Sequence, residues 1–176
     1  MNTSPKPILY PECFFDTLII EILTDSFEWK HNSEFQHVNG TEVFVVMEKR
    51  GDLEITVGFF DKNKKGLKTN KFMSDFSLSE EKDGVQWLKH STLPNQHVFY
   101  IKEGIEKWIL DTAKSLSISP LIYSIPEELD TFKNRTKRLK ISEDIEMSNF
   151  IKAIITANPP QIITLREFIV AVFGKQ

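Results

Sequence analysis

The stretch LEITVGFFD, residues 53–61, constrains the fold more than any other part of the chain. Ile55, Val57, Phe59 and Phe60 make it almost continuously apolar, and it ends abruptly at Asp61 before a lysine-rich loop. A short apolar run between polar, turn-forming segments is typical of a buried strand. The run therefore predicts a central strand of a β-sheet.

A second strand signal opens the chain and leads straight into a helix. Residues 7–10 are extended and apolar, and residues 13–24 place apolar side chains at helical spacing on one face. Between the two stand Pro11 and Glu12. The N-terminal unit is therefore predicted to be a strand followed by a helix, with a carboxylate at the junction.

The rest of the first hundred residues indicates a mixed α/β arrangement. Residues 41–50 fit either a helix or a strand, and we favour a helix because Thr41 is a plausible N-cap and Gly51 a plausible stop. The acidic stretch 75–84 is expected to be a connection. Further strands are expected at 27–31, 85–90 and 97–101.

Beyond residue 102 the apolar period becomes helical. Residues 103–117 and 143–157 are amphipathic, and the motifs Ser124–Glu127 and Thr164–Glu167 have the spacing of capping boxes that begin helices. We therefore expect an α/β fold with a small sheet, flanking helices and an α-helical C-terminal half. At 176 residues the chain is expected to form one domain, 1–176, with an α/β part at 1–101 and a helical part at 102–176 packed on it.

Composition excludes several classes of protein. A net charge of −3 gives no overall attraction to nucleic acid, so any such affinity depends on local patches. One cysteine, Cys13, rules out an intramolecular disulfide, and no apolar run approaches the roughly 20 residues of a membrane helix. The four histidines lack the spacing of zinc enzymes. We expect a cytoplasmic protein without a membrane partner.

Oxygen-bearing side chains follow two of the predicted strands. Glu12 follows the first, while Asp61 ends the strand at 53–61, with Asn63 two residues later. In an α/β sheet, ligands bind beyond the carboxyl ends of the strands, and Mg²⁺ prefers oxygen ligands. If the two strands are neighbours, these three side chains predict a site for Mg²⁺ or Mn²⁺. Such polar residues also form solvated turns after buried strands, and this alternative stays open for all three.

The order of these residues resembles the Toprim domain of topoisomerases, primases and OLD-type nucleases. Toprim domains carry a glutamate after the first strand and an Asp-x-Asp after the third, on an α/β sheet. The resemblance covers roughly residues 7–75 and implies a catalytic, metal-linked Glu12 and a catalytic, metal-binding Asp61. It also implies that Asn63 stands where the second aspartate belongs, and Cys13 where glycine is usual, so the chain is a divergent or degenerate member.

Two further acids are candidates for supporting positions behind the metal ligands. Asp16 lies four residues after Glu12, and Glu106 lies in the first turn of the helix after the last strand. By the same resemblance, extra acids at the start of the helix after the last strand, such as Glu106, can join the metal site. Acids in the first turn of a helix also favour the helix dipole whatever a protein does, and this structural reading stays open for both residues.

Lysines crowd the loop that follows Asp61. Neutralising phosphates with lysine gives affinity for nucleic acid that does not depend on base sequence. The candidate nucleic-acid-binding residues are Lys62, Lys64, Lys65, Lys68 and Lys71. A second basic run comprises Lys133, Arg135, Lys137, Arg138 and Lys140. Solvated faces carry such runs too, so this alternative also remains open.

Two functions therefore emerge from the sequence. The first is binding or Mg²⁺-dependent cleavage of a nucleic-acid phosphodiester by a Toprim-like domain. The second is a non-catalytic intracellular interaction module of the same fold, which binds a partner protein through its C-terminal helices.

Overall fold

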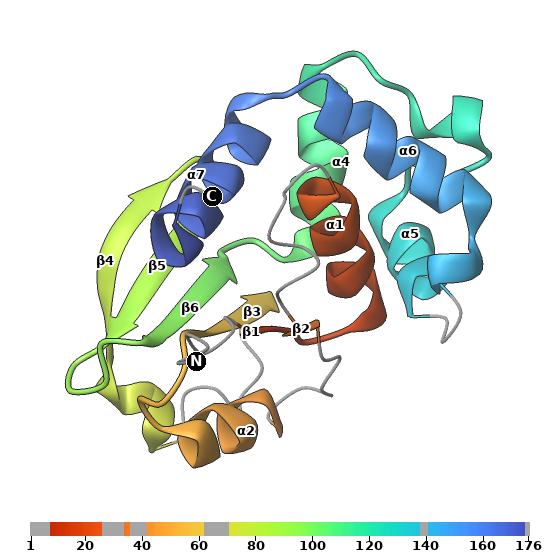
Figure 1. Ribbon diagram of the computed structural model, residues 1–176. Helices are drawn as coiled ribbons and strands as arrows, with labels where there is room; N and C mark the ends of the chain where they lie inside the picture. The colour runs from red at the N-terminus through yellow and green to blue at the C-terminus, as the bar shows by residue number, and fades with distance from the viewer. Residues whose placement is uncertain (1–7, 26–33, 36–41, 62–70, 138–140, 175–176) are drawn as a thin grey trace.

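The computed structural model describes residues 8–25, 34–35, 42–61, 71–137 and 141–174 (Figure 1). Its centre is a six-stranded sheet with strand order β2-β1-β3-β6-β5-β4. The strands are β1 (Ile8–Pro11), β2 (Glu34–Phe35), β3 (Thr56–Asp61), β4 (Phe76–Lys82), β5 (Val85–His90) and β6 (Gln96–Ile101). β2, β1, β3 and β6 run parallel to one another, whereas β5 and β4 are antiparallel to their neighbours.

Six α-helices accompany the sheet within the described ranges. They are α1 (Phe14–Thr24), α2 (Glu42–Arg50), α4 (Ile105–Ser115), α5 (Leu129–Thr136), α6 (Ile145–Thr156) and α7 (Pro160–Phe173). Short 3-10 turns add η2 (Phe72–Asp75), η3 (Pro120–Tyr123) and η4 (Ile141–Glu143). The α/β fold with a helical C-terminal half is therefore confirmed.

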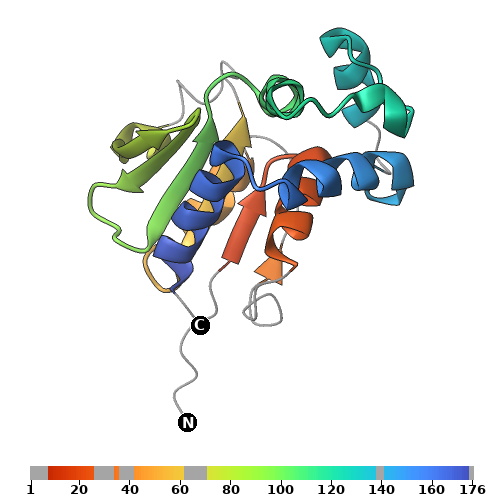
Figure 2. The ribbon, with the colours of Figure 1, turned by 90° about the horizontal axis from the view of Figure 1, so that it is seen from above.

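The two faces of the sheet bury two separate cores, because successive side chains of a strand point to opposite sides. Leu9, Phe59 and Phe99 belong to the larger core, which α1, α4, α6 and α7 complete. Tyr10 and Phe60 belong to the smaller core, which α2 and η2 complete. Figures 1 and 2 show α7 lying along the antiparallel end of the sheet and α1 beside α6, with α2 on the other side.

The central position of β3 follows from its composition. Thr56, Val57, Gly58, Phe59 and Phe60 are all buried, which is possible only because both faces of the strand are covered and both edges are paired. The predicted strand at 53–61 is confirmed and is three residues shorter at its start. The helix reading of 41–50 is also confirmed as α2.

Three expectations are wrong. Residues 76–82 form the edge strand β4 and not a connection, because they pair with β5 although their side chains are mostly exposed. The Ser124–Glu127 motif begins no helix, since α5 begins at Leu129 and Glu128 caps it. Thr164 lies inside α7, where its hydroxyl donates to Asp83.

The expected strand 27–31 and the N-cap Thr41 lie outside the described residues.

None of the helices in the described part of the chain is long and apolar enough to cross a membrane.

Gly58 offers a test of the packing around β3. A Cβ there would stand 2.5 Å from a ring carbon of Phe60 and 2.9 Å from Sδ of Met47. Because the Phe60 ring is stacked on Phe44, it has little room to move. We expect Gly58→Ala to lower the free energy of unfolding by about 1–3 kcal/mol in urea denaturation, the usual cost of overpacking a core.

The control for this variant is Ser77→Ala on the exposed strand β4, which should stay within roughly 0.5 kcal/mol of the parent. Equal stability of Gly58→Ala and the control would show that β3 is not packed as described.

Candidate functional site

The carboxyl ends of β1, β3 and β6 meet at one edge of the sheet. β1 and β3 are direct neighbours in register, with Pro11 opposite Phe59, and the backbone NH of Glu12 continues their ladder by donating to Phe59 O at 3.1 Å. Asp61 lies opposite Ile101 at the end of β6. The sequence condition for a shared site, that the two strands be neighbours, is therefore met.

Helix α1 begins immediately after this edge and carries Asp16 in its first turn. Cys13 is the N-cap, and its Sγ accepts a hydrogen bond from Asp16 N at 3.4 Å. Asp16 is 1% exposed and Glu12 is 4% exposed. The first turn of α1 thus buries a carboxylate close to the point where β1 ends.

Asp61 contacts the start of a second helix. Its Oδ2 accepts a hydrogen bond from the backbone NH of Ile105 at 3.4 Å, in the first turn of α4. Gly104, the N-cap of α4, has a φ of 88° and no side chain that could cap the helix. The Asp61 carboxylate of β3 therefore caps α4 in place of an N-cap side chain. The positive end of the helix dipole favours its negative charge.

Glu106 connects this edge to the helical half of the chain. It lies in the first turn of α4, and its Oε1 accepts a hydrogen bond from the Thr136 hydroxyl of α5 at 2.9 Å. Glu103, just before α4, instead pairs with Lys107 at 2.6 Å on the surface.

Asp16 has a clearly shifted pKa, and the other acids of this group contribute to the shift. Burial raises the pKa of Asp16 well above its ordinary value, and the charges of Asp61 and Glu12 raise it further. The nearby Cys13 side chain lowers the pKa of this carboxyl, while Glu106 adds to the increase. Three acids therefore act on Asp16 at this edge; they are Asp61 of β3, Glu12 directly after β1, and Glu106 of α4.

The carboxylate of Asp16 pairs with no cation among the described residues. Both of its oxygens are buried, and neither makes a hydrogen bond of normal geometry there. A buried, ionised carboxylate without a partner costs several kcal/mol, so such groups bind a proton or a cation. As the side chains lie, no three His, Cys, Asp or Glu residues of the described ranges stand close enough to hold one ion between them.

Cys13 is an unreactive member of the group. Burial raises the pKa of its thiol, and the neighbouring charge of Asp16 raises it further. A thiol of this kind stays protonated at neutral pH and is neither a nucleophile nor a metal ligand in that form.

Much of the predicted basic surface lies outside the described residues, as does the third predicted metal ligand. This applies to Lys62, Asn63, Lys64, Lys65 and Lys68. Lys71, at the start of η2, is exposed.

Arg135, which belongs to the second basic run, has a structural role. It pairs with Asp144 at 2.8 Å and with Glu146 at 2.6 Å, and it donates to the carbonyl of Ser124. Arg135 is therefore occupied in joining α5 to α6.

Comparison of the chain with protein-family models finds no matching family, and comparisons with curated proteins and with solved structures find no significant match. The resemblance to Toprim domains therefore rests on the residues of this chain alone.

The burial of Asp16 predicts a pH dependence of stability. Its pKa is raised on folding, so between pH 4 and the pKa of the folded state the folded protein holds a proton that the unfolded chain has released. The free energy of unfolding should therefore fall as pH rises above about 4, by at most ~1.4 kcal/mol for each pH unit within that interval. Asp16→Asn should remove this part of the decline in urea denaturation measured from about pH 4 to about pH 8.

Asp75→Asn is the matched control, since Asp75 is exposed at the end of η2. A decline with pH that is the same in the parent, in Asp16→Asn and in the control would contradict the burial of an unpaired carboxyl at position 16.

Proposed function

We propose that the acidic edge binds a divalent cation, Mg²⁺ or Mn²⁺, and that the protein uses it to bind or cleave a nucleic-acid phosphodiester. The observation that carries this proposal is the buried carboxylate of Asp16, whose two oxygens make no hydrogen bond of normal geometry with the described residues and which is close to the charges of three other acids. A cation beside Asp16 would compensate its charge and reduce its repulsion from the other three acids.

Mg²⁺ suits the arrangement better than a metal that requires a closed protein cage. Mg²⁺ is usually held by one or two carboxylates, with water and substrate phosphates completing its octahedron. The described residues offer no ready group of three ligands, but the charge of Asp61 acts on Asp16, so these two carboxylates are the proposed pair of ligands. Glu12 and Glu106 would then bind the ion through water.

The positions of Glu12 and Asp61 support a Toprim-like assignment. Glu12 directly follows the first strand of the sheet, and Asp61 ends the third, which is the order that the resemblance implies. The two strands are hydrogen-bonded neighbours, so both residues reach the same edge. A bound divalent ion would supply an activated water and would stabilise charge at a scissile phosphate.

Nucleic acid is the proposed substrate because lysines follow the metal-binding aspartate in the chain. Lys62, Lys64, Lys65, Lys68 and Lys71 come within ten residues of Asp61. Such a segment could hold a phosphate backbone beside the cation, whatever the base sequence.

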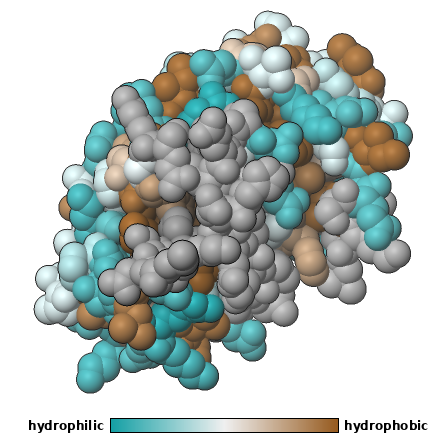
Figure 3. Space-filling view, viewed as in Figure 1, coloured by the Kyte–Doolittle hydropathy of each residue, from teal (hydrophilic) through white to brown (hydrophobic). Residues whose placement is uncertain are grey.

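The second function, an interaction module that binds a partner through the C-terminal helices, has less support. Of the exposed large apolar residues among the described ones, Ile145 belongs to α6 and none to α7. On the face shown in Figure 3, hydrophobic residues form small groups with hydrophilic residues between them. A large continuous apolar patch, which marks many protein interfaces, is not visible among the described residues of that face.

Cation binding should be visible as a stability change. We expect millimolar Mg²⁺ or Mn²⁺ to raise the melting temperature of the parent at neutral pH, because a ligand that binds only the folded state stabilises it. Asp16→Asn and Asp61→Asn should each abolish most of this increase in differential scanning fluorimetry.

The control is Glu80→Gln, which removes one negative charge from the exposed strand β4 and should retain the full increase. An equal increase in the parent and in both aspartate variants would place the cation elsewhere, and no increase with either ion would overturn the metal site.

Nucleic-acid binding should depend on the lysine segment. Replacing Lys62, Lys64, Lys65, Lys68 and Lys71 together by Gln should weaken binding of single-stranded DNA. It should also reduce the slope of log K against log salt by ~0.7 for each phosphate that the variant no longer neutralises. Fluorescence anisotropy at several salt concentrations measures both effects.

The control for this set is the pair Lys49→Gln and Lys152→Gln, exposed on α2 and α6. If both sets change the slope equally, binding is a general surface effect and the lysine segment is not a specific track.

A further inference from the structure

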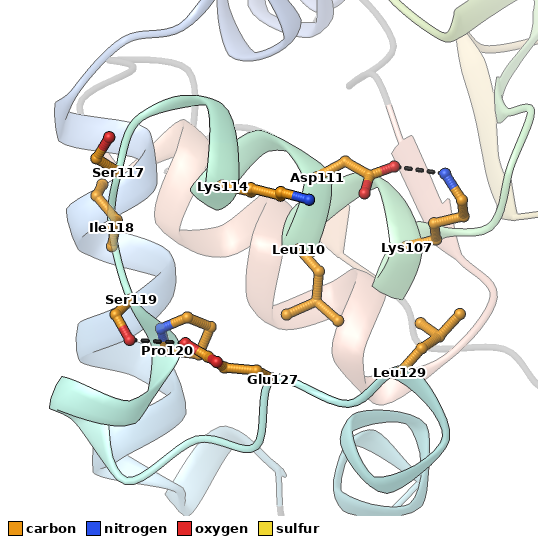
Figure 4. Close-up of a pocket in the computed structure, with 10 residues that line it drawn as sticks. All are labelled: Lys107, Leu110, Asp111, Lys114, Ser117, Ile118, Ser119, Pro120, Glu127 and Leu129. Atoms are coloured by element: carbon orange, nitrogen blue, oxygen red, sulfur yellow. Dashed lines mark hydrogen bonds and ion pairs between the residues drawn. The ribbon is translucent and has the colours of Figure 1, made fainter.

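A hollow lies between α4 and the segment that leads to α5, away from the acidic edge. Its volume is about 580 Å³, within the range of small-molecule sites. Figure 4 shows one wall formed by a stripe of α4 and the other by residues 117–129, with Leu110 reaching between them toward Leu129. Ile118 and Pro120 extend the apolar lining.

The walls of this hollow are held in place without a ligand. Ser117 has a φ of 57°, and the next residue, Ile118, donates to Ala113 O at 2.9 Å, which ties the segment to the end of α4. Across the segment, the Ser119 hydroxyl donates to Glu127 at 2.8 Å. A cavity that is already formed binds a ligand with a smaller loss of conformational entropy.

Two opposite charges flank the apolar lining and lack an ion pair with the described residues. On α4, Lys107 is already held by Glu103 and Asp111, so its charge is satisfied. Lys114, further along the same wall, is exposed and forms no ion pair with any described residue. On the facing wall, the Glu127 carboxylate accepts a hydrogen bond from the neutral Ser119 hydroxyl and pairs with no described cation.

We propose that this hollow binds a short peptide with free termini, whose apolar side chain lies between Leu110 and Leu129. Its terminal carboxylate pairs with Lys114, and its terminal ammonium pairs with Glu127. Lys114, Glu127 and the apolar residues line the same hollow, so it offers a cation, an anion and an apolar surface to such a zwitterion. Neither a fatty acid nor a nucleotide carries the cationic group that Glu127 would pair with.

The proposal does not rest on the metal site. None of the four acids of the strand edge lines the hollow, and none of the hollow's residues is a proposed cation ligand. Loss of one activity would leave the other unchanged.

The test uses the full chain and the tripeptide Ala-Leu-Ala at millimolar concentration, followed by two-dimensional amide NMR. We expect saturable shifts confined to α4 and residues 117–129. Ala-Gly-Ala should bind at least roughly tenfold more weakly than Ala-Leu-Ala, because it lacks the apolar side chain. A C-terminal amide or an N-terminal acetyl group should each weaken binding by about two- to fivefold, the range of an exposed ion pair.

Matched protein variants assign each charge. Amidation of the peptide should have no effect on binding to Lys114→Gln, and acetylation should have none on Glu127→Gln, since the variant has already removed the ion pair in question. Asp130→Asn on α5 is a control that should bind like the parent. No saturable shifts, shifts elsewhere, or equal binding of capped and uncapped peptides to all variants would overturn the proposal.

Discussion

The buried carboxylate of Asp16 dominates the electrostatics of the edge where the parallel strands end. Asp16 lies in the first turn of α1, just after the end of β1, is 1% exposed, and its two oxygens make no hydrogen bond of normal geometry with the described residues. In its charged form this carboxylate lowers the stability of the fold, because a buried charge needs compensation. Asp61, Glu12 and Glu106 make the cost larger. A chain that needed only stability would gain by placing an apolar residue there.

The topology explains why these acids come together. β1 and β3 are adjacent and parallel, so Glu12 and Asp61 reach the same edge, and α1 starts there and turns Asp16 inward. α4 starts at the same edge after β6 and adds Glu106, which α5 holds through Thr136. The N-termini of α1 and α4 thus lie beside a group of negative charges. Their positive dipole ends reduce the repulsion between the acids but cannot replace a counter-ion.

The sequence predicted the frame of this arrangement well. Apolar periodicity located β1, α1, β3 and α4, because each buries a face whose spacing is visible in the chain. The sequence-based predictions failed where a residue's local pattern suggests one role and its contacts in the folded protein give it another. Residues 76–82 are polar because an edge strand is exposed, and Thr164 has capping-box spacing but serves inside α7 by donating to Asp83.

Asp16 shows what sequence alone could not provide at the site. A first-turn aspartate is expected on the surface, where it favours the helix dipole, and nothing in its neighbours indicates burial. Its environment depends on β3 and α4, which are distant in the sequence and close in space. The sequence therefore predicted only a supporting position for Asp16, whereas the structure buries it and brings it close to three other acids.

Diffraction from crystals soaked in Mn²⁺, recorded for its anomalous signal, tests the central claim most directly. The account predicts one strong anomalous peak at the strand edge, about 2.0–2.6 Å from a carboxylate oxygen of Asp16 or Asp61. A fully soaked crystal with no peak at that edge would contradict it, and the buried carboxyl of Asp16 would then be a protonated part of the core.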